Sequence, residues 1–314
     1  MTVEHVDVLI VGAGLSGIAA GYAIQTRCPR KTYAIVEARA AIGGTWDLFR
    51  YPGVRSDSDM HTLGYSFRPW PERKAIADGP AIRAYVRATA AEFGIDQKIR
   101  YQSRVRRLAW SSREARWTVD IERGPERAPV QMTCAFLFMC TGYYDYDQGY
   151  LPEWPGFARY QGRIVHPQQW PEDLDYAGKR IVVIGSGATA VTLVPALAER
   201  AAHVVMLQRS PTYIVARPSV DAIGGWLRQR LPIRLADGLT RWKNITLGMY
   251  FYRLARRRPE RVRAAILQMA REQLGPEYDV ERDFSPRYNP WDQRLCLAPD
   301  GDFFNALKAG TASV

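Results

Sequence analysis

Two glycine-rich segments of this chain have the spacing of dinucleotide-binding turns. They are Gly12-Ala13-Gly14-Leu15-Ser16-Gly17 and Gly185-Ser186-Gly187-Ala188-Thr189-Ala190, the second followed by Val191. In such a turn the first glycine allows the tight bend, and the second lets the backbone approach a pyrophosphate. The third glycine, or an alanine, lets helix and strand pack closely, so that the phosphates lie on free N–H groups at the helix N-terminus. The spacing therefore predicts two dinucleotide sites.

The residue about 20 positions after the first turn points to an unphosphorylated ribose at the first site. Glu37 ends the apolar segment 32–36 and stands 20 residues after Gly17. A carboxylate accepts hydrogen bonds from ribose hydroxyls and repels a 2′-phosphate. The first site is therefore expected to take FAD or NAD.

The corresponding position after the second turn has the opposite charge. Arg209 follows the apolar segment 203–207, stands 19 residues after Ala190, and is followed by Ser210. A guanidinium and a hydroxyl are what a 2′-phosphate requires, so this site is expected to take NADPH. Together the two sites predict a flavoprotein reduced by NADPH. The alternative is that Glu37 and Arg209 are only solvated strand ends.

Each turn also has the strand–turn–helix context that makes the motif credible. Apolar segments 6–11 and 181–184 precede the two turns. The expected fold class is α/β, with two Rossmann-like dinucleotide-binding domains, one for FAD and one for NADP. A linker at 152–171, rich in Pro, Gly and Trp, marks the boundary between them.

The expected FAD-binding domain covers residues 1–150, and the expected NADP-binding domain covers 151–314 with a helical insertion at about 220–290. Within the first domain, residues 40–67 read as a long loop and 80–93 as a helix. Further strands are expected at 101–110, 117–122 and 130–133, a buried strand at 135–140, and a short helix at 303–308.

Composition and cysteine usage fit a protein of a reducing cytoplasm. The chain has 314 residues, enough for two domains, and 47% of them are hydrophobic. Its four cysteines, Cys28, Cys134, Cys140 and Cys296, include no C-x-x-C pair and are expected to be buried thiols. The missing redox pair argues against the disulfide-reductase branch of flavoproteins. No histidine spacing predicts a metal site.

A net charge of +11 raises the question of an anionic partner. The densest basic cluster lies within 253–271, where Val262, Ile266 and Met269 would share one helical face. One interpretation is a solvated basic face on a packed helix. The other is peripheral contact with a membrane. No motif predicts nucleic-acid binding.

Two further segments resemble a known family. Residues 43–57 read Gly-Gly-Thr-Trp-Asp-Leu-Phe-Arg-Tyr-Pro-Gly-Val-Arg-Ser-Asp, and residues 160–171 read Tyr-Gln-Gly-Arg-Ile-Val-His-Pro-Gln-Gln-Trp-Pro. The first resembles a loop typical of flavin-dependent Baeyer–Villiger monooxygenases. The second is similar to their fingerprint F-x-G-x-x-x-H-x-x-x-W-P, with Tyr160 in the Phe position. Segments 209–213 and 288–296 resemble one subgroup of the family, and the resemblance covers essentially the whole chain.

The resemblance implies a mechanism and two catalytic residues. NADPH would reduce FAD, O2 would add at the flavin C4a carbon, and the resulting C4a-peroxyflavin would oxidise a ketone, or the sulfur of a thioamide or sulfide. Arg294 matches the family's active-site arginine, which stabilises the anionic peroxide, and Asp57 matches the aspartate that tunes it. On the residues alone, Asp57 could instead cap a helix starting near Ser58, and Arg294 could form an interdomain ion pair.

The resemblance also implies cofactor contacts. Arg55, Ser56 and Asp57 would touch both cofactors. The positions that match FAD contacts are Ser16, Glu37, Gly44, Thr45, Trp46, Asp47, Leu48 and Val105. For His166 and Trp170 a hinge or packing role is expected.

Members of the family continue well beyond the equivalent of Val314, returning to the FAD domain with a strand and helices. The present chain is therefore expected to expose apolar surface in its FAD domain and to bind FAD poorly. Two alternatives stay open: a monooxygenase acting only on heteroatoms, and a truncated nucleotide-binding fragment without activity.

Overall fold

The computed structural model describes residues 3–314. The chain forms two compact units, each described here by itself. The first unit comprises the chain up to Arg50 together with Gly79–Gln169, and the second comprises Tyr51–Asp78 together with Trp170–Val314.

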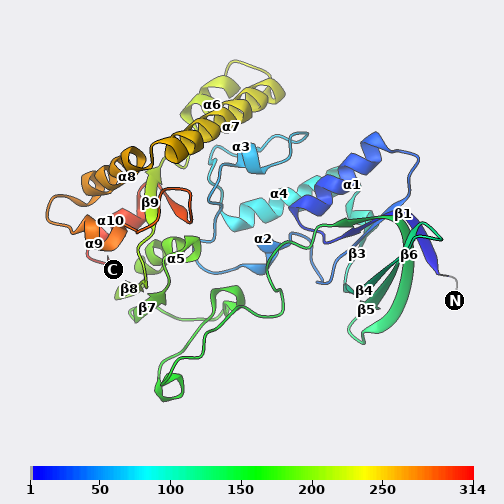
Figure 1. The fold of residues 1–314 in the computed structure, drawn as a ribbon, viewed down its shortest axis with the longest axis horizontal. Coiled ribbons are helices and arrows are strands. Elements are labelled where there is room, and N and C mark those ends of the chain that lie inside the picture. The colour runs from blue at the N-terminus through cyan, green and yellow to red at the C-terminus, as the bar shows by residue number, and fades with distance from the viewer. Residues whose placement is uncertain (1–2) are drawn as a thin grey trace. The chain divides into compact units, whose positions relative to one another are not determined.

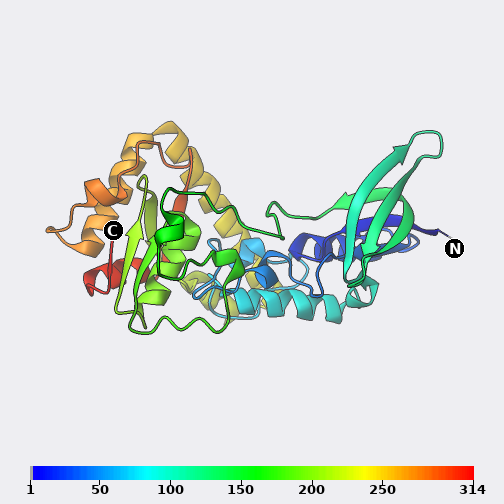
Figure 2. The ribbon, with the colours of Figure 1, turned by 90° about the horizontal axis from the view of Figure 1, so that it is seen from below.

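A six-stranded sheet with the order β3-β2-β1-β6-β5-β4 organises the first unit. Parallel pairing joins β1 to both β2 and β6, whereas β5 runs antiparallel to β4 and β6. Figure 2 shows the β4–β5 hairpin as a long twisted ribbon. The strands are β1 (Glu4–Val11), β2 (Tyr33–Val36), β3 (Ile99–Arg100), β4 (Ser103–Ser111), β5 (Arg116–Arg123) and β6 (Ala128–Met139). The helices are α1 (Leu15–Arg27), α2 (Thr45–Leu48) and α4 (Gly79–Glu92), with 3-10 turns η1 (Asp96–Lys98), η2 (Phe157–Arg159) and η3 (Pro167–Gln169).

The core of this unit lies on both sides of β1. Leu9 and Val11 point to one face, where they pack with Val119 and Met132 of the antiparallel strands. Ile10 points to the other face, which α1 covers over β1 and β2. This alternation follows from the period of two along a strand. The first turn and α1 are thus held on a buried, parallel part of the sheet.

The strand expected to be buried at 135–140 is largely exposed, and Leu137 and Cys140 are its half-buried residues. It is the end of β6, a single 12-residue strand that also includes the segment expected as a separate strand at 130–133. Phe136 and Phe138 are 56% and 44% exposed. They share a face with Ile10, and α1 packs against β1 and β2 rather than β6. The prediction of a buried strand, which was based on its apolar composition, is therefore wrong.

The second unit combines two small parallel sheets with a group of helices. One sheet has the order β11-β8-β7, and the other pairs β9 with β10. The strands are β7 (Arg180–Ile184), β8 (His203–Leu207), β9 (Tyr213–Arg217), β10 (Leu295–Pro299) and β11 (Ala312–Ser313). The helices are α3 (Met60–Leu63), α5 (Ala188–Ala198), α6 (Ala222–Arg228), α7 (Ile233–Arg257), α8 (Pro259–Leu274), α9 (Val280–Phe284) and α10 (Asp302–Lys308). Figure 1 shows α6 and α7 side by side.

Residues 51–78, expected within the FAD-binding domain, pack with the second unit. The backbone N–H of Ala75 donates to the carbonyl of Ser219 over 2.7 Å, and Lys74 forms a β-bridge with Val220. The compact units therefore do not follow a single boundary near residue 150. The excursion also contains α3, so the expected long loop at 40–67 holds two short helices.

The basic region 253–271 is divided between two helices that meet at Arg258. Ile266 is buried and faces inward from α8, which fits the interpretation of a solvated basic face on a packed helix. Over residues 3–314, the longest and most apolar helices still fall short of what crossing a bilayer requires. Of the four cysteines, Cys28 is exposed at the end of α1, contrary to expectation, because it follows the last helical turn.

Candidate functional site

Steric contacts explain why two positions of the first turn, Gly12 and Gly17, must be glycine. A Cβ added at Gly12 would lie 2.4 Å from the carbonyl oxygen of Cys140, and the φ of Gly12 is +107°. A Cβ added at Gly17 would lie 1.9 Å from the carbonyl oxygen of Gly12. Neither position accepts a side chain without displacing backbone. In the second turn the third position is Ala190, which is buried without such a contact.

The helices that follow the two turns begin without a side-chain cap. Gly14 is the N-cap of α1 and Gly187 that of α5, and neither helix has an acidic residue in its first turn. Asp59, Asp221 and Asp279 cap α3, α6 and α9 through their carboxylates, whereas α2, α7, α8 and α10 also begin without a side-chain cap. The N–H groups at the two glycine turns are therefore left for an external acceptor, and the helix dipole favours an anion there.

Glu37 is held against the first turn. Its side chain is buried, Oε2 accepts a hydrogen bond from the N–H of Ala13 over 2.8 Å, and Oε1 accepts one from the N–H of Arg39 over 2.9 Å. Each carboxylate oxygen has a second lone pair. The carboxylate is thus positioned at the end of β2, where a ribose acceptor is required.

The second turn is tied to the segment that carries the expected phosphate selector. Ser186 Oγ donates to the carbonyl of Ser210 over 2.9 Å, and Thr212 Oγ1 donates to Ser186 Oγ over 3.1 Å. Arg209 and Ser210 are exposed just beyond β8. The structure thus brings Ser186 next to Ser210 and leaves the Arg209 guanidinium in solvent.

The expected contacts at 44–48 lie beside the first turn, and three arginines surround one of them, Asp47. A Cβ at Gly44 would lie 3.0 Å from Gly14 Cα, so the two backbones touch. Asp47 is 3% exposed and pairs with three arginines, Arg39 at 2.7 Å and Arg50 and Arg83 both at 3.2 Å. Three guanidiniums around one carboxylate leave excess positive charge, which suits a pyrophosphate. Thr45, Trp46 and Leu48 lie on the same short helix, α2.

Ser16 and Val105 lie in different surroundings. Ser16 is exposed in the first turn of α1. Val105 lies at a bulge of β4, where its side chain packs against the core of the sheet.

In the second unit, residues 51–57 pack beside the second turn. Tyr51 makes a side-chain hydrogen bond with Thr189 of α5, and a Cβ at Gly53 would lie 2.7 Å from the Cβ of Ala196. Burial raises the pKa of Tyr51. Arg55 forms an ion pair with Asp302, in the first turn of α10. Sequence reasoning gave no role to Tyr51, although it lies in the segment 43–57, or to Asp302, which lies in no motif.

Asp57 and Arg294 lie in one neighbourhood with the second turn. Burial raises the pKa of Cys296 to about 11, Arg294 opposes this shift and Asp57 adds to it. The Arg294 side chain also lies beside Gly187, where an added Cβ would be 3.8 Å from its Cδ. Asp57 is exposed, and Asp59, not Asp57, caps α3, so the capping interpretation of Asp57 is wrong.

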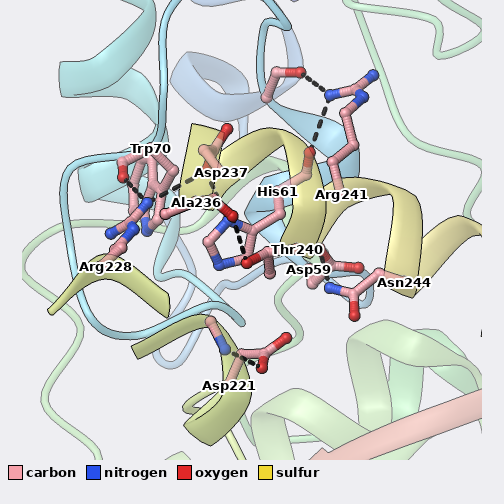
Figure 3. Close-up of polar contacts among 12 residues, drawn as sticks. Asp59, His61, Trp70, Asp221, Arg228, Ala236, Asp237, Thr240, Arg241 and Asn244 are labelled. Atoms are coloured by element: carbon pink, nitrogen blue, oxygen red, sulfur yellow. Dashed lines mark hydrogen bonds and ion pairs between the residues drawn. The ribbon is translucent and has the colours of Figure 1, made fainter. Parts of the chain in front are cut away.

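A buried polar network anchors the 51–78 segment to α6 and α7 (Figure 3). His61 Nδ1 lies 2.7 Å from Asp237 Oδ1, and Arg228 also pairs with Asp237 at 3.2 Å. Arg241 donates to the carbonyl of His61 over 2.8 Å, and Asn244 donates to Asp59 Oδ1 over 2.9 Å. The signal for this network was available, because Asp237 is the one acidic residue within 222–258.

The sequence pattern of the flavin-binding monooxygenase-like family matches residues 6–226, which include both turns. The chain belongs to this family. It is 55% identical over 312 residues to the FAD-containing monooxygenase EthA of Mycolicibacterium smegmatis. It is 53% identical over 315 residues to the putative FAD-containing monooxygenase MymA of Mycobacterium tuberculosis. The alignments cover 99% of this chain but 63% of each relative, so the chain spans under two thirds of their length.

Two solved structures have folds similar to that of this chain. An oxidized steroid monooxygenase bound to NADP superimposes with a TM-score of 0.77 at 25% identity, over 99% of this chain and 65% of that one. A complex of OTEMO with FAD and NADP gives a TM-score of 0.75 at 20% identity, over 98% of this chain and 65% of that one. The expected α/β class with two Rossmann-like domains is thereby confirmed.

Proposed function

We propose that this chain is the nucleotide-binding part of an FAD-dependent monooxygenase that uses NADPH and O2. The observation that carries the proposal is the pair of uncapped glycine turns, with Glu37 at one and Arg209 at the other. A buried acid beside the first turn suits FAD, and an exposed arginine beyond β8 suits the 2′-phosphate of NADPH. The names of the relatives support a flavin monooxygenase.

Each glycine turn would bind one of the two cofactors. The N–H groups of α1 and the arginines around Asp47 would hold the FAD pyrophosphate, and Glu37 its ribose. The N–H groups of α5 would hold the NADPH pyrophosphate, with Arg209 and Ser210 on the 2′-phosphate. FAD, when bound, would supply electron transfer from NADPH and the activation of O2.

Arg294 is the proposed catalytic cation and Asp57 its carboxylate partner. A guanidinium beside the reacting oxygen stabilises negative charge, which oxidation of a ketone by a nucleophilic oxidant requires. Arg55, Ser56 and Asp57 would contact the cofactors. The proposed substrates are ketones, thioamides and sulfides, and Arg294 favours ketone oxidation over a purely heteroatom-directed enzyme.

One observation favours the alternative of a fragment without activity. Phe136 and Phe138 are exposed on β6, a strand of the sheet that also holds the first turn. Exposed apolar surface of this kind weakens a binding unit. We also place the protein in the cytoplasm, with peripheral membrane contact through the basic region 253–271 as part of the proposal.

The test is the visible spectrum of the purified chain, followed by NADPH oxidation with added FAD. Weak flavin retention and NADPH oxidation stimulated by a substrate would support the proposal. Product analysis with a cyclic ketone and a thioether then separates ketone from sulfur oxidation. NADPH oxidation that no substrate stimulates would identify an inactive fragment, and stoichiometric yellow flavin would contradict the expected weak retention.

A further inference from the structure

The helical hairpin of the second unit carries many large apolar side chains that are exposed. Leu235, Leu239, Trp242 and Met249 recur along α7 at intervals of four, three and seven residues, which places them on one side of the helix. Trp242 is 66% exposed. The α6–α7 face is defined here by the exposed side chains of Trp226 in α6 and of Leu235, Leu239, Trp242 and Met249 in α7.

The centre of α7 is exposed on every side. Each residue from 246 to 253 is exposed, although the helix packs against α6 and α3 through its first half and against α8 through its end. A helix that is apolar all round normally lies in an apolar environment. The centre of α7 therefore has the composition of a contact surface rather than of a solvated helix.

The charge around this surface is almost entirely positive. Residues 222–258 contain nine arginines and lysines and a single acid, Asp237, which is buried and paired. Among residues 3–314, no ion pair involves Arg234, Arg253, Arg257 or Arg258, and all four are exposed. Positive charge next to exposed tryptophan and tyrosine complements an anionic surface that has an apolar interior.

We propose that the α6–α7 face docks on an anionic phospholipid bilayer. Tryptophan and tyrosine favour the headgroup level, and unpaired arginines attract anionic lipids. Because no described helix can span a bilayer, α7 would lie in the interface plane. The peripheral membrane contact proposed above would thus be made by α6 and α7 rather than by the whole region 253–271. It does not depend on either nucleotide site.

Vesicle flotation tests the proposal. The chain is mixed with vesicles of phosphatidylcholine alone or of phosphatidylcholine with phosphatidylserine, at low and high salt. We expect binding to the phosphatidylserine vesicles at low salt, weaker binding at high salt, and little binding to phosphatidylcholine. Absence of binding at low salt, or equal binding to both compositions, would overturn the proposal.

Matched variants locate the surface. W242A with M249A, and separately R253S with R257S, should each lower the affinity for phosphatidylserine vesicles about tenfold or more. Lys98 and Arg113 are exposed basic residues of the first unit, so K98S with R113S is the control and should bind as the unmodified chain does. Circular dichroism checks that each variant is folded.

The competing occupant is a second copy of the chain. If size-exclusion chromatography shows a dimer that W242A with M249A converts to a monomer, while vesicle binding is unchanged, the face is a protein interface and the proposal fails. Flavin and NADPH titrations run on the same preparations report on the nucleotide sites separately.

Discussion

Nδ1 of His61 lies 2.7 Å from Oδ1 of Asp237, and the two residues, 176 positions apart in sequence, are both buried. The pair joins the 51–78 segment to α7. Since Arg55 and Asp57 belong to the same segment, the buried pair helps to fix the backbone that presents them. Arg228 shares the Asp237 carboxylate, so one acid serves two partners.

We predict that Asp237→Ala destabilises the second unit by about 1–3 kcal/mol, because it leaves the buried His61 without its partner, whereas Arg228 keeps the carbonyls of Trp70 and Glu72 as acceptors. Urea unfolding followed by circular dichroism measures the change. Asp175→Ala is the control, since the Asp175 side chain is 76% exposed and lies 4.0 Å from Arg200. Equal stability of the two variants would show that the buried pair contributes nothing.

Arg209→Ser should lower the affinity for NADP+ about 10- to 100-fold while leaving that for NAD+ nearly unchanged, because only the former carries the 2′-phosphate. Calorimetric titration with both nucleotides measures the ratio. Arg217→Ser, at the end of the neighbouring β9, is the control. An unchanged preference for NADP+ in the Arg209 variant would remove the basis for assigning the second site.

Gly17→Ala and Gly187→Ala should both weaken nucleotide binding, but only Gly17→Ala should also lower the stability of the fold. The added Cβ at Gly17 meets backbone at 1.9 Å, so we expect a loss of about 1–3 kcal/mol in stability together with loss of FAD binding. At Gly187 the nearest atoms are those of Arg294, the closest at 3.8 Å, so the variant should fold normally and bind NADP+ more weakly. Thermal unfolding and nucleotide titration separate the two effects. Matching thermal stability in both variants would contradict this steric account.

Gly149→Ala should disturb the segment that resembles the family fingerprint. A Cβ at Gly149 would lie 1.9 Å from Cε1 of His166, so the imidazole must move. Faster tryptic cleavage at Arg159 and Arg163 would report the loosening. His166→Ala in the same chain should restore the slower cleavage, and Gly225→Ala, where the added Cβ meets nothing within 4 Å, is the control. Failure of the second substitution to rescue would assign another role to Gly149.

Stability of the α6–α7 hairpin should depend on pH through Asp221. Burial raises the pKa of this carboxyl, but hydrogen bonds from Lys243 and the N–H of Gly224 outweigh it and hold the pKa below the ordinary value of 3.8. A depressed pKa stabilises the fold fully above 3.8, and this contribution is lost as the pH falls through the lower, folded-state value.

Asp221→Asn keeps an N-cap acceptor but removes the charge. The variant should therefore melt below the unmodified chain at neutral pH, and the gap should close in acid. Thermal unfolding at both pH values measures it. A gap that persists below the folded-state pKa would show that the ion pair with Lys243 is not its source.

The sequence predicted the parts of the fold that local patterns determine. Both glycine turns, their flanking strands and Glu37 are local signals, and the structure has them as expected. The pairing of β9 with β10 joins residues about 80 positions apart, and the composition of 295–299 alone does not indicate a strand partner. The exposure of Phe136 likewise depends on which strands α1 covers, which the sequence of β6 does not contain.

Some candidate site residues were likewise indicated by the sequence, whereas others could be found only from the three-dimensional structure. Asp57 and Arg294 were named through the resemblance, and their shared neighbourhood with Gly187 is visible only in three dimensions. His61 belongs to none of the predicted sites. Its partner Asp237 stands out as the one acid within 222–258, but sequence alone does not tell a buried acid from a solvated one.

The excursion of residues 51–78 into the second unit has a consequence for biosynthesis. On the ribosome this stretch emerges early, while α7, which supplies Asp237 and Arg241, is made more than 150 residues later. Until then His61 has no buried partner, and the four aromatic residues of the segment, Tyr51, Tyr65, Phe67 and Trp70, lack part of the unit in which they pack. A chaperone that shields this stretch during translation would therefore raise the yield of correctly folded protein.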